Sequence, residues 1–171
     1  MNGDVVSTGT GITVNNIISF GGIAITVFNI TGHVGAINVK ENVVSGEGLG
    51  MYVGGNIDGH DGGLNVGGNI TTNTGSGISV VGNIAAKTVG INVGRNVTSS
   101  ASVAIEVGGT VSAKNDNGIQ IHGGVETNGT YSIYVDALIS PSTIYLRDAN
   151  PDGYSVINMN DVVYSLCPAD Q

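Results

Sequence analysis

The sequence predicts an all-β fold, a right-handed parallel β-helix of about six coils with about 27 to 28 residues in each coil. Three observations predict it. Short apolar triplets recur along most of the chain, roughly every 11 to 14 residues. Within each triplet two apolar residues flank an outward one, as in a strand buried on one face. The chain contains 29 glycines, and its apolar residues are mostly valine and isoleucine, a composition that favours strands and tight turns.

The repeat unit has the form G-I-x-V-x-G-N-[IV] and recurs from Gly11 to Ile139. A fixed period of this kind is typical of a solenoid, in which each repeat adds one layer to a continuous core. Between Ala36 and Ala104 the spacings alternate 14, 13, 14, 13, 14, as two unlike halves of one coil would produce. We therefore expect coils of about 27 to 28 residues with two half-coils each; a flat coil of about 14 residues is the alternative.

Six apolar columns are expected to stack inside the helix, three from each half-coil. The first half-coil supplies Ile37, Leu64, Ile91 and Ile119, then Val39, Val66, Val93 and Ile121, then Val43, Ile70, Val97 and Val125. The second supplies Met51, Ile78, Ile105 and Ile133, then Val53, Val80, Val107 and Val135, then Ile57, Ile84, Val111 and Ile139. Because neighbouring rungs lie about 4.8 Å apart, such a stack forms a rod about 30 Å long.

The corners of the coils are marked by asparagine and glycine. Asparagine precedes the third apolar position in seven consecutive units: Asn16, Asn29, Asn42, Asn56, Asn69, Asn83 and Asn96. Asparagine hydrogen-bonds neighbouring backbone, so these residues are predicted to stabilise stacked turns. The neighbouring glycines are expected to supply the positive φ angles that such corners often need: Gly54, Gly55, Gly67, Gly68 and Gly82.

The repeats occupy residues 1–142, and the pattern fades from Thr143 onward. Residues 143–171 are predicted to form the last coil and a C-terminal cap, with a Pro-Asp-Gly turn signal in the loop at 147–153. A different terminus is expected there, because an open solenoid end exposes unpaired strand edges. Residues 1–10 carry no evident polar cap, so we expect the natural chain to continue upstream.

The formal net charge is −8, from 5 Lys and Arg against 13 Asp and Glu. Without a Lys and Arg cluster, neither nucleic acid nor an anionic membrane surface is expected as a partner. No apolar run approaches the roughly 20 residues of a membrane span. The single Cys167 excludes an intramolecular disulfide and offers no zinc spacing, and no cofactor is expected.

Two sets of outward residues are candidates for ligand binding. Amide side chains recur on one sheet, and two tyrosines belong to the facing set: Asn38, Asn65, Asn92 and Gln120, with Tyr52 and Tyr134. Amides and aromatic planes suit a sugar-binding surface, whereas an amide ladder also simply stabilises stacked strands. Both interpretations stay open at the level of sequence.

His33 and His60 are the candidate metal ligands. They occupy the same place in the repeat one coil apart, so they should stack at about one strand spacing, with Asp61 beside the second. Stacked imidazoles are a geometric precondition for shared metal binding. Lys87 occupies the same place one coil later, which argues against a cation there and favours exposed corner residues.

No catalytic residue is predicted. Polysaccharide hydrolysis needs two carboxylates gathered at one site, one of which acts as a general acid. The densest acidic stretch runs from Asp58 to Asp61, and no second carboxylate falls at the matching positions one coil away.

The repeated G-I-x-V-x-G-N-[IV] units resemble the right-handed parallel β-helix repeats of large bacterial surface and secreted proteins and, more distantly, those of pectate-lyase-like carbohydrate enzymes. The resemblance covers about three quarters of the chain, and the matched positions are core and corner positions. It implies an extracellular or cell-surface location and a glycan or host-surface ligand. The corners of this chain are short, whereas the enzymes carry long loops that build a cleft.

Two functional hypotheses follow. The first is a non-catalytic structural or adhesive module of a larger bacterial surface or secreted protein, able to associate end to end or through its strand edges. The second is a carbohydrate-active enzyme or glycan-binding fragment on the same scaffold. A groove with two carboxylates on one sheet would favour the enzyme.

Overall fold

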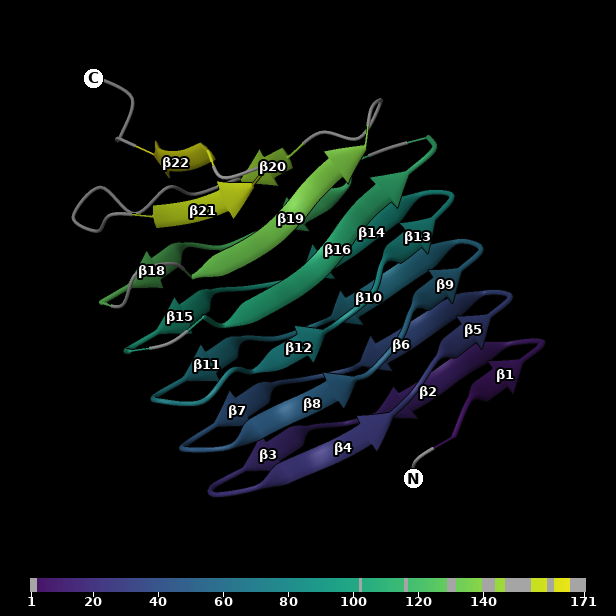
Figure 1. Ribbon diagram of the computed structural model, residues 1–171, viewed down its shortest axis with the longest axis horizontal. Coiled ribbons are helices and arrows are strands. Elements are labelled where there is room, and N and C mark those ends of the chain that lie inside the picture. The colour runs from purple at the N-terminus through teal and green to yellow at the C-terminus, as the bar shows by residue number, and fades with distance from the viewer. Residues whose placement is uncertain are drawn as a thin grey trace.

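The computed structural model describes residues 3–101, 103–115, 117–128 and 132–139, together with the backbone of three later strands at 144–146, 155–159 and 162–166. This part of the chain is all β and contains no helix. It forms a parallel β-solenoid of about five turns, close to the six coils expected (Figure 1). The prediction of a parallel β-helix is therefore confirmed. Cys167 and the loop at 147–153 lie outside the described residues.

Three sheets run along the solenoid, here called A, B and C. Sheet B contains β2 (Thr10–Val14), β6 (Gly35–Val39), β10 (Gly62–Val66), β14 (Val89–Val93), β17 (Ile119–Ile121) and β20 (Ile144–Leu146). Sheet C contains β3 (Ile17–Ser19), β7 (Val43–Ser45), β11 (Ile70–Thr72), β15 (Val97–Ser99) and β18 (Val125–Thr127).

Sheet A has two rows of strands. One row holds β4 (Ile23–Val27), β8 (Leu49–Val53) and β12 (Ile78–Val80), and the other holds β1 (Val5–Ser7), β5 (Ile30–Gly32), β9 (Ile57–Gly59) and β13 (Ile84–Ala86). Two longer strands, β16 (Ile105–Ala113) and β19 (Ile133–Ile139), join the rows in the later coils. A coil of the early repeats therefore contains four short strands, one each in sheets B and C and two in sheet A.

The strand register confirms the longer of the two coil lengths considered. Asn65 of β10 pairs with Asn38 on one side and Asn92 on the other, both in parallel. In sheet A, Ile84 pairs with Ile57 at the same interval. Strands of successive half-coils lie in different sheets or rows, which excludes the flat coil.

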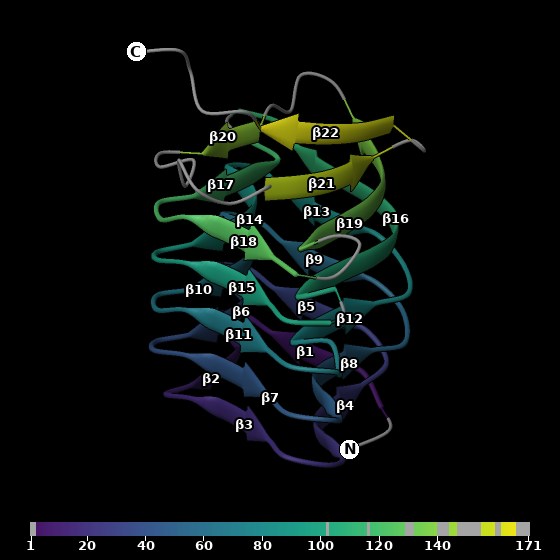
Figure 2. The same cartoon turned by 90° about the vertical axis from the view of Figure 1, so that its left-hand side faces the viewer.

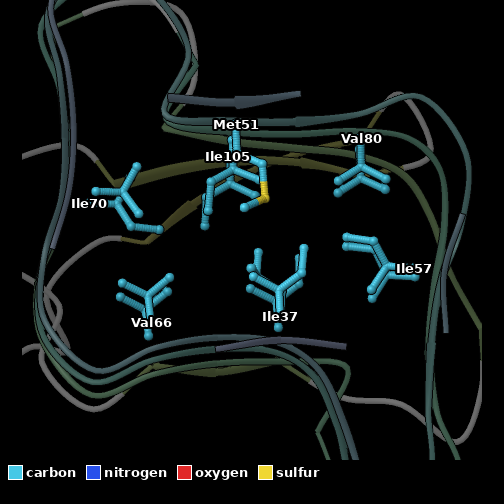
Figure 3. Close-up of a cluster of buried hydrophobic side chains, with 14 of the residues drawn as sticks. Ile37, Met51, Ile57, Val66, Ile70, Val80 and Ile105 are labelled. Atoms are coloured by element: carbon cyan, nitrogen blue, oxygen red, sulfur yellow. The ribbon is translucent and has the colours of Figure 1, made fainter. Parts of the chain in front are cut away.

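The predicted apolar columns fill the interior, because alternate residues of each short strand point inward. Figure 3 shows Ile37 and Val66 of sheet B facing Met51 and Val80 of sheet A, with Ile70 of sheet C at one end of the cross-section. Nearly all column members are buried with at most 1% exposure. Burying aliphatic side chains in this way is the main favourable term in folding.

One column residue was predicted wrongly. Ile139 is 48% exposed, and Leu138 packs against the core in its place. The register between β16 and β19 shifts after Val107, so that Leu138 pairs with Val111. The corner of the later coil is one residue shorter, which moves the inward position one residue toward the N-terminus.

Two asparagine ladders run along the solenoid at its corners. The first contains Asn16, Asn42, Asn69 and Asn96, and the second begins at Asp4 and continues through Asn29, Asn56 and Asn83. Each Oδ1 accepts the backbone N–H of the next member one coil later, at 2.8 to 3.2 Å. The predicted role of these residues in stacked corners is confirmed.

The corner glycines were expected for the wrong reason. None of the five predicted positions has a positive φ: Gly54, Gly55, Gly67, Gly68 and Gly82. What they provide is space. A Cβ at Gly68 would lie 2.5 Å from the Oδ1 of Asn42, and one at Gly82 would meet the Oδ1 of Asn56. The Gly-Asn dipeptide therefore recurs because each asparagine side chain occupies the place of a Cβ in the coil after it.

The first coil of the solenoid is mostly apolar, and Asp4 is the one charged side chain of residues 3–28. Its strands β1 to β4 each pair with one neighbouring strand in the described part of the chain, and residues 5–28 contain no Asp, Glu, Lys, Arg or His. Five apolar side chains of this coil are about half exposed or more: Val6, Ile18, Phe20, Ile23 and Phe28. Strand edges without a further partner among the described residues favour association with another β-structure.

The opposite end is formed by β21 (Ser155–Met159) and β22 (Val162–Leu166), which lie across the top of Figure 2. The β21 strand continues sheet A in parallel with β19, and β22 pairs with it in the antiparallel direction. Much of the segment predicted as a last coil and cap, 143–171, lies outside the described residues. Over the described residues, no helix has the length and apolarity to cross a membrane.

Candidate functional site

An amide ladder lies on the outer face of sheet B. Asn38, Asn65 and Asn92 occupy the outward position of β6, β10 and β14, between inward-facing apolar neighbours. The Nδ2 of Asn65 donates to the Oδ1 of Asn38 at 2.7 Å, and the Nδ2 of Asn92 donates to the Oδ1 of Asn65 at 2.6 Å. Gln120 of β17 continues the column in register with Asn92. The structure thus contains the ladder expected from the sequence.

The ladder leaves hydrogen-bonding capacity unused. A carboxamide has two N–H donors and an oxygen with two lone pairs, and each ladder step uses one donor and one acceptor. The Oδ1 of Asn92 is buried and has no hydrogen-bond partner. That oxygen is enclosed, but the amide side chains are partly exposed, so the second N–H of each carboxamide can donate to a ligand without breaking the ladder.

An open hollow of about 410 Å³ lies over the ladder. Its polar lining consists of Thr10, Asn38, Asp61, Asn65, Thr88, Asn92, Gln120 and His122, and its apolar lining includes Val34, Ile37, Leu64 and Val89. We call this surface the amide hollow. It contains one carboxylate, that of Asp61, whose Oδ1 lies 2.9 Å from the Nδ1 of His60.

The two candidate tyrosines lie elsewhere. Tyr52 and Tyr134 are outward residues of sheet A, which forms the wall opposite sheet B (Figure 3). Ser79 and Glu106 stand between them in the same column. Three strand spacings separate the tyrosines by about 14 Å. The structure therefore does not bring them to each other or to the amide ladder, and the six candidate residues do not form one site.

The predicted histidine stack is present. The rings of His33 and His60 lie with their centroids 5.0 Å apart and their planes at 27°. The side chains of His60 and Asp61 are 48% and 57% exposed, so solvent screens their contact. Among the described residues, no three His, Cys, Asp or Glu side chains are grouped closely enough to hold a metal ion. Metal binding by this pair stays a prediction.

The sequence interpretation missed the continuation of the histidine column. Lys114 follows Lys87 at the same interval that separates His60 from His33, so that four basic side chains lie along one corner: His33, His60, Lys87 and Lys114. We call this row the basic ridge. The repeat spacing would have revealed Lys114 if it had been followed from Lys87 over one more coil.

Two further hollows lie beside the basic ridge. One has a volume of about 480 Å³ and is lined by Ser7, Thr8, Thr31, Gly32, His33, Asp58 and His60. The other, of about 400 Å³, is lined by Asp58, Gly59, His60, Ala85, Ala86, Lys87, Lys114 and Asn115. Asp58 and His60 line both, so the two hollows adjoin along the corner.

Comparisons of the chain with protein-family models, with curated proteins and with solved structures gave no match.

Proposed function

We propose that the chain is a non-catalytic structural or adhesive module of a larger bacterial surface or secreted protein, and that it binds a glycan in the amide hollow. The observation that carries the proposal is the row of hydrogen-bonded amides along the floor of that hollow. Sugar hydroxyls both donate and accept hydrogen bonds, and so do carboxamides. The amides also repeat at the strand spacing of about 4.8 Å, which suits an extended ligand laid along the solenoid axis.

The rigidity of the ladder supports binding. The central amide, that of Asn65, is fixed by hydrogen bonds to both neighbours, and its strand is part of a continuous sheet. Little side-chain entropy is then lost when a ligand binds, because the side chains are already ordered. Val34, which is 52% exposed, and Val89 add apolar surface at the edge of the hollow.

The lining of the amide hollow supports a non-catalytic role. Glycoside hydrolysis uses a pair of carboxylates flanking the scissile bond. The hollow is lined by one, Asp61, and this side chain contacts the imidazole of His60. Asp58 is three residues away in sequence but lines the hollows on the other side of the corner.

The structural part of the proposal includes end-to-end association through the N-terminal coil. Four strand edges and several exposed apolar side chains lie there, and Asp4 is the one charged side chain of residues 3–28 that a second copy would meet. Because the net charge of the chain is −8, two copies repel each other through their other surfaces, and the nearly uncharged first coil is where they can approach.

Glycan binding tests the proposal. The chain is passed over an array of neutral and charged glycans, and the affinity of bound neutral ones is measured by calorimetry. Asn92→Leu removes a carboxamide that lines the hollow, with the hydrogen bonds it can offer a ligand, and should weaken binding about tenfold. Ser79→Leu, on the outward face of sheet A, is the matched control and should leave binding unchanged. An array without any bound glycan, or release of reducing ends from a polysaccharide, would overturn the proposal.

A further inference from the structure

The basic ridge gathers several of the few basic side chains of an acidic chain. Its members account for two of the five Lys and Arg residues and two of the three histidines. All four side chains are exposed. They belong to successive coils: the backbone N–H of Lys87 donates to the carbonyl of His60 at 2.9 Å, and that of Lys114 donates to the carbonyl of Ala86 at 3.3 Å. The ridge side chains therefore follow one another along the solenoid axis at about 4.8 Å per rung.

We propose that the basic ridge and its two hollows form a second binding site, for a linear acidic polysaccharide whose carboxylates lie along the solenoid axis. This site goes beyond the amide hollow. It lies on the sheet A side of the corner, and none of the four ridge side chains lines the amide hollow.

The shape of the corner provides room for such a chain. The floor of the hollows contains Gly32, Gly59 and Ala86, all buried and all small. The two glycines pack against the backbone of the next strand: a Cβ at Gly32 would collide with the carbonyl oxygen of Gly35, and one at Gly59 with that of Gly62. The ridge side chains stand beside this floor. The outward side chains of the same strands, Thr31, Asp58 and Ala85, are also short, so an extended ligand can run past several coils without meeting a bulky side chain.

The lysine end of the ridge supplies most of the attraction. Within the described ranges, neither Lys87 nor Lys114 has a carboxylate at ion-pair distance, and both line the hollow of about 400 Å³. The Nδ1 of His60 already contacts the carboxylate of Asp61, so this side chain offers less to an anionic ligand than the lysines do. Asn115 and Thr31 lie in the hollows as hydrogen-bonding partners for sugar hydroxyls.

Asp58 limits the affinity for an anion. It is exposed and lines both hollows, so its carboxylate faces any ligand laid along the ridge. A dense polyanion such as a nucleic acid suffers most from that repulsion, and it also requires more cations than two lysines to displace its counterions. A polysaccharide has a lower charge density and many hydroxyl groups. The two lysines, the amide of Asn115 and the hydroxyl of Thr31 therefore favour an acidic glycan over a nucleic acid.

The test measures binding of alginate oligosaccharides, in which every sugar carries a carboxylate, to the full chain at low and high salt. The double variant Lys87→Gln, Lys114→Gln should weaken binding about fivefold or more at low salt, with the difference shrinking at high salt. Lys40→Gln with Arg95→Gln is the matched control. It removes the same charge from exposed positions outside both hollows and should change the affinity less than twofold. Asp58→Asn should strengthen binding.

Several outcomes would overturn the inference: an equal loss in both double variants, weaker binding by Asp58→Asn, or tighter binding of polyuridylate than of alginate. The variants distinguish the two sites. Asn92→Leu should weaken binding of a neutral glycan and leave alginate binding unchanged, and the double lysine variant should do the reverse. Binding of a neutral glycan without alginate binding would leave the amide hollow in place and remove the ridge site.

Discussion

The side-chain oxygen of Asn56 accepts the backbone N–H of Asn83, its counterpart one coil later, at 2.8 Å. The backbone N–H of Asn56 donates in turn to Asn29 at 2.8 Å. A corner N–H lies outside the regular strand pairing, and a polar group left without a partner there destabilises the fold. The ladder supplies that partner at each coil.

Asn56→Ala should therefore lower the free energy of unfolding by about 1–3 kcal/mol, because the amide of Asn83 loses its acceptor. Urea denaturation followed by circular dichroism measures the change. Asn56→Asp is the control, since a carboxylate at the ladder's start, that of Asp4, already accepts the N–H of Asn29 at 3.2 Å. The aspartate should retain most of the stability. Equal losses for both variants would show that the acceptor is not what matters.

Gly82→Ala should destabilise the solenoid by about 1–3 kcal/mol, because its Cβ would meet the Oδ1 of Asn56 and the carbonyl of Gly55. Gly21→Ala is the matched substitution at a site where a Cβ has no neighbour within 4 Å and φ is not positive. It should be neutral or stabilising by up to about 1 kcal/mol. Thermal melting of both variants distinguishes the steric explanation from a general effect of glycine replacement.

Thr72 and Ser45 give opposite predictions from one buried column of sheet C. The Oγ1 of Thr72 has no hydrogen-bond partner, whereas the Oγ of Ser45 donates to the carbonyl of Gly48. Thr72→Val should keep or raise the stability, because it removes an unsatisfied polar atom at nearly constant shape, and Ser45→Ala should cost about 1 kcal/mol. Chemical denaturation of the two variants side by side checks the sign. A loss at Thr72 as large as that at Ser45 would mean that its hydroxyl is satisfied in solution.

Phe20→Lys together with Ile18→Lys should weaken self-association. Both side chains are exposed on the N-terminal coil, at 80% and 53%, and two added charges there repel a second copy. Sedimentation velocity over a concentration series measures the effect. Val81→Lys, at a site 51% exposed in the middle of the solenoid, is the control and should leave the association unchanged. A chain that stays monomeric at high concentration would contradict the end-to-end part of the proposed function.

The core was predictable because each coil repeats the same physical requirement. An inward position must be apolar at every rung, so a residue such as Ile84 is indicated by Ile57 before it and Val111 after it. The same repetition predicted the stack of His33 and His60 and the ladder through Asn65. Side chains related by one period are the ones that sequence alone can place.

The remaining features depend on relations between unlike positions. The role of Gly82 as a space for the Asn56 side chain required the backbone path of the corner. The exchange of Ile139 for Leu138 followed from one shortened corner. Tyr52 lies in the facing set, as expected, but that this set is the outward column of the opposite sheet and cannot share one surface with the amides required the cross-section of the coil. The repeat period predicts which residues stack on one another. It does not predict where each stacked column lies around the cross-section of the coil.

Each step of an asparagine ladder connects a coil to the coil directly before it, as from Asn42 to Asn69 and from Asn69 to Asn96. Coupling along the rod is therefore one-dimensional, and cooperative folding passes from layer to layer. A defect in a central coil separates two blocks that can melt independently, whereas the same defect in the first coil shortens a single block. The position of a substitution along the axis thus determines whether unfolding occurs in one transition or in two.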